Sequence, residues 1–471
     1  MVGRAREKDI LDHCVGSGRP EFVVVYGRRR VGKTYLIREF FGDRFSFYAT
    51  GINNTNTRGQ LKAFNKSLIE YGSDKKTIPE DWLEAFSRLK IVLENEKIRR
   101  DPVSKRRIVF LDEMPWMDTP RSDFKSALDY FWNSWGSAQK DLMLIVCGSA
   151  TSWVMNNLLN EKGGFHNRIT RRLHLAPFSL KECRDLLRQN NVVMTDKQIM
   201  ETYLVFGGIP FYINLIDERL SLSQNIDTLI FDEDGDLHFE YENLFRSLFT
   251  SPKKHYAIIK AMSERKDGIT RKDLSKVPGI GDGEPLTKAL RELVECGFVR
   301  KYQGCSSVKQ GFIFQIVDPF ILFSLKHQES GVLRSWENYA GSPGYFAWRG
   351  NAFEILCLNH VKEIKNALGI SGVETFEYAW RSKKTSPAVQ IDLIIERRDG
   401  IINICEVKFT DNEFSIDADT ADGMIRKLEA FRSEMHPDKA LHLTLISAAG
   451  VRKNKYSSLI QRIITGEAFF D

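Results

Sequence analysis

Short apolar runs alternate with helical stretches along the first part of the chain. Four runs with few or no polar residues occupy positions 22–26, 45–49, 108–111 and 142–147. Strands of this kind are typical of a sheet that helices cover on both faces, which is the usual setting of a parallel sheet. We therefore predict an α/β domain with a parallel sheet over residues 1–178.

The pattern changes twice beyond residue 178. Residues 179–249 show helical periodicity interrupted by a Gly207-Gly208-Ile209-Pro210 turn, which predicts a small helical lid. Residues 250–317 predict a helix at 256–263, a short helix opening at Thr270 and a helix with Leu286, Leu290, Leu293 and Val294 on one face. Two strand-like runs follow at 297–302 and 311–317, and three helices followed by a hairpin are the order of a winged helix.

The last part of the chain combines helical and strand-like patterns. An aromatic-rich linker, 318–346, leads to a domain predicted over 347–471. The pattern predicts elements at 349–368 (helix), 390–396 and 401–407 (strands), 423–434 (helix) and 441–447 (final strand). Together, these segments predict three or four folded domains, which agrees with a length of 471 residues.

A phosphate-binding motif, GxxxxGK[ST], lies between the first predicted strand and the helix that begins near Lys33. Its glycines let backbone N–H groups surround phosphates, and the helix N-terminus adds its dipole. Lys33 would reach the β- and γ-phosphates, and the Thr34 hydroxyl would bind Mg²⁺. The sequence therefore predicts an ATP·Mg²⁺ site formed by Gly27, Arg28, Arg29, Arg30, Val31, Gly32, Lys33 and Thr34.

Two acids end the apolar strand Ile108–Leu111. An acidic strand end is more often an ordinary solvated loop, but here a P-loop precedes it by some eighty residues. In that context, Asp112 would hold the Mg²⁺-bound water and Glu113 would polarise the water that attacks the γ-phosphate.

Two further positions fit roles at the γ-phosphate. Ser149, at the tip of the next strand, could sense the γ-phosphate or the attacking water, and a turn-forming serine is the alternative. Arg168, followed by Arg171 and Arg172, could supply an arginine finger within the chain or to a neighbouring subunit. Exposed arginines on a solvated or DNA-facing surface are the alternative.

The ordered set of motifs over about the first 250 residues resembles the prokaryotic archaeal-type ATPases, in the signal-transducing STAND branch of the AAA-like P-loop enzymes. This resemblance implies a RecA/AAA-like core and a nucleotide contact from Pro210 in the lid, where the residues alone suggest only a tight turn. Asn167 stands where the family usually has Gly. The motifs are Gly3-Arg4 with Glu7, the P-loop, Leu111-Asp112-Glu113, Cys147-Gly148-Ser149, Asn167-Arg168, Pro177-Phe178 and Gly207-Gly208-Ile209-Pro210.

Two carboxylates and a lysine come together in the predicted C-terminal hairpin. Pairing of the strands 390–396 and 401–407 would place Asp392 near Glu406, and strand alternation puts Lys408 on the same face as Glu406. Carboxylates this close repel unless a cation joins them, and Mg²⁺ or Mn²⁺ suits such oxygen ligands. Lys408 would then orient or deprotonate a water against a phosphodiester. An exposed salt bridge is the alternative.

This D…ExK pattern resembles the PD-(D/E)XK nuclease superfamily, and specifically the C-terminal domain of unknown function that commonly follows archaeal-type ATPases. The resemblance implies an α/β restriction-endonuclease-like fold. It makes Glu354, Asp392 and Glu406 the metal-binding acids and Lys408 the catalytic lysine. The stretches Asp318-Pro319-Phe320 and Trp348-Arg349-Gly350 fit the same pattern.

Basic residues of the predicted winged helix suggest DNA as a partner. The polar face of the helix 285–296 carries Thr287, Lys288 and Arg291, and phosphate contacts from such residues bind DNA with strong salt dependence. Winged helices also serve as packing modules in such ATPases, so both roles remain open. Further basic residues nearby in sequence are Lys253, Lys254, Arg271, Lys272 and Arg300.

Composition narrows the setting. The net charge of +6 permits nucleic-acid binding without demonstrating it. No apolar run approaches the roughly 20 residues of a membrane helix, and the N-terminus is charged, so we expect a cytoplasmic protein that neither spans a membrane nor carries a signal peptide. Scattered cysteines without a CxxC pair fit a reduced compartment and argue against structural zinc: Cys14, Cys147, Cys183, Cys296, Cys305, Cys357 and Cys405.

The sequence thus favours an ATPase that couples nucleotide state to DNA binding and metal-dependent DNA cleavage. The competing hypothesis is a switch in which ATP governs homo-oligomerisation or DNA occupancy and the C-terminal domain only binds. Retention of Glu354, Asp392, Glu406 and Lys408 favours the first.

Overall fold

The computed structural model describes residues 2–149, 151–159, 167–249, 251–265, 267–303, 311–328, 335–382, 384–386 and 388–471. Cys305, named above, lies outside these residues. The chain divides into two units, Met1–Pro177 and Phe178–Asp471.

The first unit is built on a parallel five-stranded sheet, as the apolar runs predicted. Its order is β2-β3-β4-β1-β5, and every neighbouring pair is parallel. The strand that the sequence did not reveal is β5, because its residues Arg-Arg-Leu-His are mostly polar and only Leu173 is buried. The strands are β1 Glu21–Tyr26, β2 Phe47–Thr50, β3 Arg107–Asp112, β4 Leu142–Gly148 and β5 Arg171–His174.

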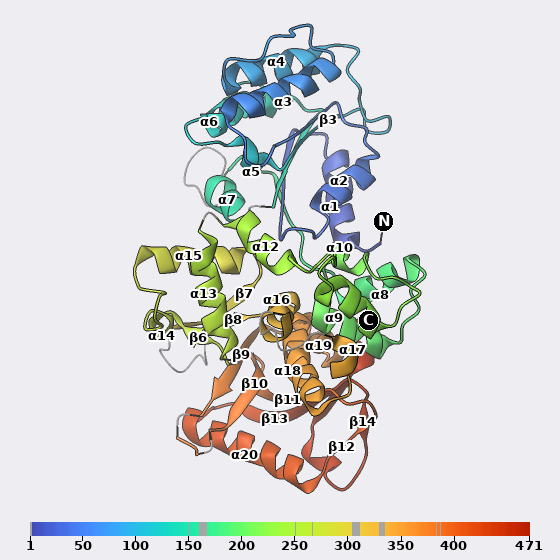
Figure 1. Cartoon of the computed structure of the whole chain (residues 1–471), viewed down its shortest axis with the longest axis vertical. Coiled ribbons are helices and arrows are strands. Elements are labelled where there is room, and N and C mark those ends of the chain that lie inside the picture. The colour runs from blue at the N-terminus through green and yellow to red at the C-terminus, as the bar shows by residue number, and fades with distance from the viewer. Residues whose placement is uncertain are drawn as a thin grey trace. The chain divides into compact units, whose positions relative to one another are not determined.

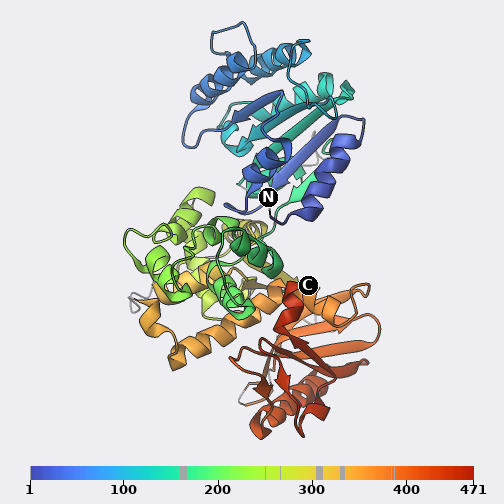
Figure 2. The same ribbon diagram turned by 90° about the vertical axis from the view of Figure 1, so that its right-hand side faces the viewer.

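Helices cover both faces of this sheet. Figures 1 and 2 show α3, α4 and α6 on one face and α1 and α2 on the other. The first face is packed with aromatic rings, and Trp82 contacts Phe64, Phe86 and Phe124 edge-on or tilted. The helical elements are α1 Ala5–Gly16, α2 Lys33–Phe41, α3 Thr57–Glu70, α4 Trp82–Glu94, α5 Met114–Met117, α6 Phe124–Ser134, η1 Gly136–Ala138, α7 Thr151–Val154 and η2 Met155–Leu159.

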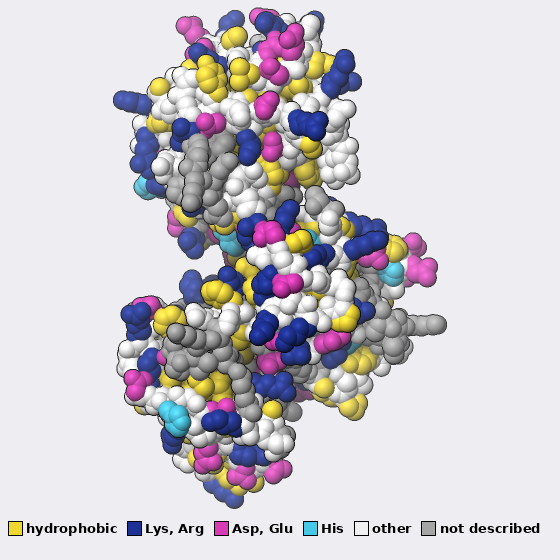
Figure 3. Space-filling view, turned by 90° about the vertical axis from the view of Figure 1, so that its left-hand side faces the viewer, with side chains coloured by type: hydrophobic (Ala, Val, Ile, Leu, Met, Phe, Trp, Pro, Cys, Tyr) yellow, Lys and Arg dark blue, Asp and Glu magenta, His cyan; other side chains and the backbone are white. Residues whose placement is uncertain are grey.

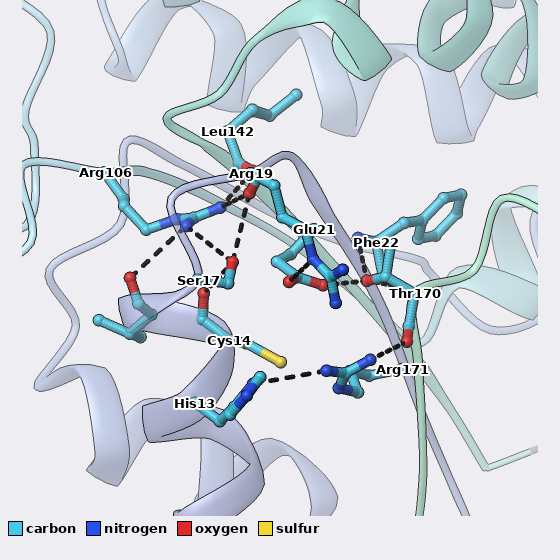
Figure 4. A network of polar contacts seen from close by, with 11 residues as sticks. His13, Cys14, Ser17, Arg19, Glu21, Phe22, Arg106, Leu142, Thr170 and Arg171 are labelled. Carbon is cyan, nitrogen blue, oxygen red and sulfur yellow. Dashed lines mark hydrogen bonds and ion pairs between the residues drawn. The ribbon is translucent and has the colours of Figure 1, made fainter.

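A buried polar network ties α1 to the start of the sheet strands (Figure 4). The guanidinium of Arg106 is 2% exposed and donates to the backbone carbonyls of Val15, Arg19 and Leu142 and to the Ser17 hydroxyl. The fully buried carboxyl of Glu21 pairs with Arg19 and accepts from Thr170. Burial would raise the pKa of Glu21, but these hydrogen bonds outweigh it and lower the pKa.

We expect Arg106→Met to destabilise the first unit by about 3 kcal/mol or more. Methionine keeps most of the volume but leaves several buried carbonyls without a donor, and each such loss costs roughly 1–3 kcal/mol. Calorimetry of the full chain measures the change in stability. The unfolding transition of the first unit is the one whose midpoint temperature ATP is expected to raise. Arg58→Met, at an exposed position of α3, is the matched control. Equal stability of the two variants would contradict a structural role for the network.

The second unit begins with helices. A tight contact explains one glycine of the Gly207-Gly208-Ile209-Pro210 turn, since a Cβ on Gly208 would lie 1.9 Å from the Phe178 carbonyl oxygen. Phe178 N–H donates to the Gly208 carbonyl at 2.6 Å, so two motifs quoted from the sequence meet here. The elements are α8 Leu180–Gln189, α9 Asp196–Phe206, α10 Pro210–Ile213, α11 Leu222–Ile226, η3 Asp227–Phe231 and α12 Glu240–Leu248.

Three helices and a small antiparallel sheet follow in the order that the sequence predicted. The sheet order is β6-β8-β7, and β6 was not anticipated because it is only two residues long. Thr270, the expected helix start, caps α14 by accepting from Asp273 N–H. The elements are α13 Pro252–Ser263, β6 Ile269–Thr270, α14 Arg271–Leu274, α15 Glu284–Glu295, β7 Val299–Gln303 and β8 Phe312–Ile316.

The helix predicted over 349–368 is two helices, α18 Pro343–Asn359 and α19 Val361–Ala367. They are separated at the buried His360, whose Nε2 accepts from Leu180 N–H at 3.2 Å while Nδ1 contacts the Leu356 carbonyl at 2.9 Å. The predicted linker is also mostly helical, with α16 Pro319–Phe323, η4 Ser324–Gln328 and α17 Trp336–Tyr339.

A mixed five-stranded sheet, in the order β15-β13-β11-β10-β9, ends the chain. The expectation that 441–447 is the final strand is wrong, because β15 pairs with β13 beyond it. Figure 1 shows α18 and α20 on opposite sides of this sheet. The elements are β9 Thr375–Arg381, β10 Gln390–Arg397, β11 Ile401–Lys408, β12 Phe414–Ser415, α20 Ala418–Met435, β13 Ala440–Ser447, β14 Val451–Arg452, η5 Ser457–Leu459, β15 Arg462–Thr465 and η6 Gly466–Phe470.

Candidate functional site

The P-loop adopts the strand–loop–helix form that its motif requires. It joins β1 to α2, whose N-cap is Gly32 with φ +88°. A Cβ on Gly27, at φ +146°, would lie 2.3 Å from the Leu175 carbonyl oxygen, so this position needs glycine. The buried Lys33 ammonium donates to the carbonyls of Gly27 and Arg28 at 3.0 and 2.9 Å. Its charge therefore lies within the loop that would surround a phosphate.

The two expected magnesium ligands are adjacent. Thr34 Oγ1 donates to Asp112 Oδ1 at 3.0 Å, which joins the start of α2 to the end of β3. Cys147 Sγ also donates to Asp112 Oδ1, at 2.7 Å, and burial with the nearby Asp112 charge raises the pKa of this thiol. A hydroxyl and a carboxylate are oxygen donors of the kind that Mg²⁺ prefers, so the residues present fit the ion.

Glu113 and Ser149 contact each other directly. Glu113 has φ +43° at the end of β3, and its Oε2 accepts from both the hydroxyl and the N–H of Ser149, at 2.8 and 3.0 Å. The structure thus brings together the expected water-polarising acid and the expected sensor. In this geometry, Ser149 holds the carboxylate of Glu113.

Arg4 is a P-loop neighbour whose position only the tertiary structure reveals. Its buried guanidinium donates to the carbonyls of Val31, inside the P-loop, and Ala176, just after β5, at 2.9 and 2.8 Å. Arg4 therefore braces the loop against the neighbouring segment. The signal in the sequence was the Gly3-Arg4 pair with Glu7, which suggested family membership but no contact.

The remaining residues predicted for the nucleotide site stay predictions. Arg168 forms an ion pair with Asp129 of α6. Arg171 and Arg172 lie on the edge strand β5. Pro210 is the first residue of α10 in the second unit.

The C-terminal hairpin pairs β10 with β11 as predicted. The two strands are antiparallel from Glu396 opposite Ile402 to Leu393 opposite Cys405, and Asp392 and Glu406 lie just beyond this last pair. Asp392 Oδ1 accepts from Gln390 Nε2 at 2.8 Å. Asp392 of β10 and Glu354 of α18 line the same two cavities, so predicted acids from two separate segments approach one another.

Glu406 is bracketed by two ammonium groups. Lys408 lies 2.9 Å from its Oε1, and Lys427 of α20 lies 2.6 Å from its Oε2. Burial alone would raise the pKa of Glu406, but the attraction of Lys427 and Lys408 lowers it. Burial would likewise lower the pKa of Lys427, yet Glu406, with Asp392 and Glu354, raises it. Lys427 was not predicted from the sequence, because helical periodicity does not show how α20 is aligned against the sheet.

The ion pairs of Glu406 differ from the prediction that Glu354, Asp392 and Glu406 together bind a metal ion. Within the described ranges, no three His, Cys, Asp or Glu side chains form a group that could hold a metal ion. Both carboxylate oxygens of Glu406 contact lysine ammonium groups. Glu354 and Asp392 remain oxygen donors in one cavity, so metal binding there stays a prediction.

The basic residues of the 250–317 segment differ in exposure. Lys288 and Arg291 are exposed on α15. Arg300, expected beside them, is instead turned into the protein, where its Nε donates to Gln315 Oε1 and its guanidinium stacks on Tyr302. Its burial lowers its pKa. The alternation of β7 puts Arg300 and Tyr302 on one face, and Tyr302 packs against the core of the C-terminal sheet. Arg300 is therefore a packing residue rather than a phosphate contact.

Figure 3 shows Lys and Arg side chains interspersed with Asp and Glu over the face in view, without a continuous field of one sign. Among the described helices, none has the length and apolar character needed to cross a membrane.

The fold and the P-loop define a P-loop ATPase architecture. Residues 1–216 match the family model described as an ATPase domain predominantly from Archaea, and this part of the chain is an ATPase domain of that type. An uncharacterised protein of Methanocaldococcus jannaschii is 25% identical over 333 residues, 69% of this chain and 68% of that protein.

Two solved structures are also similar. The Walker-type ATPase of Pyrococcus abyssi has 19% sequence identity, with 69% of this chain and 96% of that chain covered and a TM-score of 0.49. A STAND protein with a tetratricopeptide repeat sensor from Pyrococcus horikoshii has 17% identity, with 79% and 52% covered and a TM-score of 0.32.

Proposed function

We propose that this protein is an ATP-gated DNA-processing enzyme, in which the N-terminal ATPase controls a metal-dependent phosphodiesterase site in the C-terminal domain. The observations that support the proposal are that Glu354 of α18 and Asp392 of β10 line the same cavities and that Glu406 and Lys408 of the neighbouring strand β11 form an ion pair. Lys427 adds a second ammonium group to this cluster. Acids beside lysines suit a reaction in which a metal ion stabilises charge on a phosphodiester.

The order of the C-terminal elements also supports the proposal. A helix precedes the antiparallel strands β9, β10 and β11, α20 follows, and β13 then pairs parallel to β11. This order fits the nuclease-like fold implied by the D…ExK motif. Asp392 and Glu406 lie on the neighbouring strands β10 and β11, where paired backbones hold their positions.

In the ATPase, Lys33 and the P-loop backbone would bind the phosphates, Thr34 and Asp112 would hold Mg²⁺, and Glu113 would polarise the attacking water. Magnesium, when bound, neutralises charge that develops on the phosphates. Ser149 keeps the Glu113 carboxylate in place, and Arg168, Arg171 or Arg172 would supply a finger within the chain or in a homo-oligomer. The lid residue Pro210 would contact the nucleotide.

One observation favours the competing switch. Both oxygens of Glu406 are held by lysines, as expected if the cluster is only a buried ion-pair network that stabilises the domain. In that case, ATP would govern DNA occupancy or oligomerisation, and the C-terminal domain would serve as a binding module.

Incubating the full chain with plasmid DNA and Mg²⁺ or Mn²⁺ tests the proposal. We expect nicked or linear products whose rate changes between ATP, ADP and a non-hydrolysable ATP analogue. Cleavage at the same rate with every nucleotide would show that the protein is a nuclease but that ATP does not control it. Absence of cleavage, with ATP hydrolysis intact, would favour the switch.

We propose that DNA contacts the exposed face of α15. The double variant Lys288→Glu/Arg291→Glu should weaken DNA binding and reduce the slope of log affinity against log salt by about 2, since each phosphate contact contributes roughly 0.9. Fluorescence anisotropy over a salt series measures both quantities. Lys260→Glu/Lys276→Glu changes the net charge equally on α13 and after α14, and is the control. An unchanged slope in the α15 variant would make this segment a packing module.

A further inference from the structure

Two cavities meet at the acidic pair of the C-terminal domain. One, of about 350 Å³, and the other, of about 800 Å³, are both lined by Glu354 and Asp392. Their other walls differ in chemistry. A ligand that occupied both would therefore need one apolar part and one anionic part, with the acids between them.

The smaller cavity is mainly apolar. Its walls come from the end of α13, from β8, from α16 with η4, and from α18. Trp348 supplies an aromatic surface, and the side-chain amides of Gln315 and Asn351 supply hydrogen-bonding groups. Its volume is at the lower end of the roughly 300–1,000 Å³ of small-molecule pockets. It has room for one nucleobase with its sugar.

The larger cavity is polar and carries charges of both signs, with Glu429 on its wall besides Glu354 and Asp392. Arg426 and Lys427 of α20 line it together with the hydroxyls of Thr385 and Ser386. Guanidinium, ammonium and hydroxyl groups are the usual partners of phosphate oxygens. The Lys427 ammonium, now 2.6 Å from Glu406, lies within this wall.

We propose that the C-terminal site takes an unpaired nucleotide of a DNA strand, with its base in the apolar cavity and its phosphate beside Arg426 and Lys427 in the larger one. This inference rests on the proposed function and specifies its substrate class as single-stranded or locally unpaired DNA. Enzymes that act on an unstacked nucleotide commonly hold its base in a closely fitting pocket with an aromatic wall.

The test compares a short oligodeoxythymidine with an abasic oligonucleotide of the same phosphate count. Fluorescence anisotropy on the full chain is measured with EDTA present, so that neither metal nor cleavage is needed. We expect the base-containing strand to bind about tenfold more tightly, a typical effect of stacking one base on an aromatic side chain. Ala352→Phe fills the apolar cavity from α18 and should abolish this preference.

Ala367→Phe, at an exposed position near the end of α19, is the matched control and should keep the preference. Ile355→Phe, a smaller increase in volume on the same cavity wall, replaces Ala352→Phe if that variant does not fold. Equal affinity of wild type for the two strands, or a preference that survives in the folded cavity variants, would overturn the inference. Plasmid cleavage without base preference would leave the nuclease proposal standing, whereas base preference without metal binding or cleavage would leave only a nucleotide-binding site.

Discussion

Glu113→Gln is expected to bind ATP with near wild-type affinity and to hydrolyse it about 10²–10⁴-fold more slowly, the usual contribution of a general base. The amide keeps the size of the carboxylate and can still contact Ser149, but it cannot polarise a water. Calorimetric titration measures the binding of ATP, and phosphate release measures its turnover. Lys33→Ala should instead weaken binding, because it removes the charge held within the P-loop.

The control for this pair is Glu39→Gln, an exposed carboxylate of α2 that should change neither quantity. Ser149→Ala provides a second comparison, since it removes a hydroxyl 2.8 Å from Glu113 Oε2 without touching the carboxylate itself. A smaller loss of kcat than in Glu113→Gln would identify Ser149 as a positioning residue. Wild-type hydrolysis by Glu113→Gln would show that another group polarises the water.

Asp392→Ala should lose both Mn²⁺ binding and DNA cleavage, with cleavage falling by about 100-fold or more because the metal no longer stabilises the phosphodiester charge. Lys408→Ala should fold and bind metal yet fail to cut. Calorimetric titration with Mn²⁺ and a cleavage assay on plasmid and linear DNA, with and without ATP, separate these outcomes. If Lys408 were only a salt-bridge partner of Glu406, its loss would cost about 0–1 kcal/mol of stability and leave the chemistry unchanged.

The same sheet offers a matched control. Lys439 lies 2.9 Å from Glu396 of β10, the same separation as Lys408 and Glu406, and neither Lys439 nor Glu396 belongs to the proposed metal site. Lys439→Ala should therefore reduce stability without affecting cleavage. No metal binding by wild type, or cleavage that survives in Asp392→Ala, would refute the nuclease proposal and favour the switch.

The sequence alone determined the architecture of the ATPase core. Apolar runs at 22–26, 108–111 and 142–147 must be covered on both faces, which restricts them to a parallel sheet. The spacing of the P-loop motif predicts a strand before it and a helix after it. The pairing of the strands that carry Asp392 and Glu406 follows because two short strands are joined by a tight turn. Such features depend on residues close in sequence, so local patterns suffice to predict them.

Only the tertiary structure decided contacts between distant segments. Arg4 reaches Val31, Lys427 reaches Glu406, and Arg300 turns inward, and no periodicity encodes the register of one element against another. The polar strand β5 was missed for a related reason, since an edge strand needs little apolar surface. The sequence thus determined which residues carry charge and where the strongly apolar strands lie. The packing of helices on sheets decided which charges meet, because that depends on side-chain contacts between elements far apart in the chain.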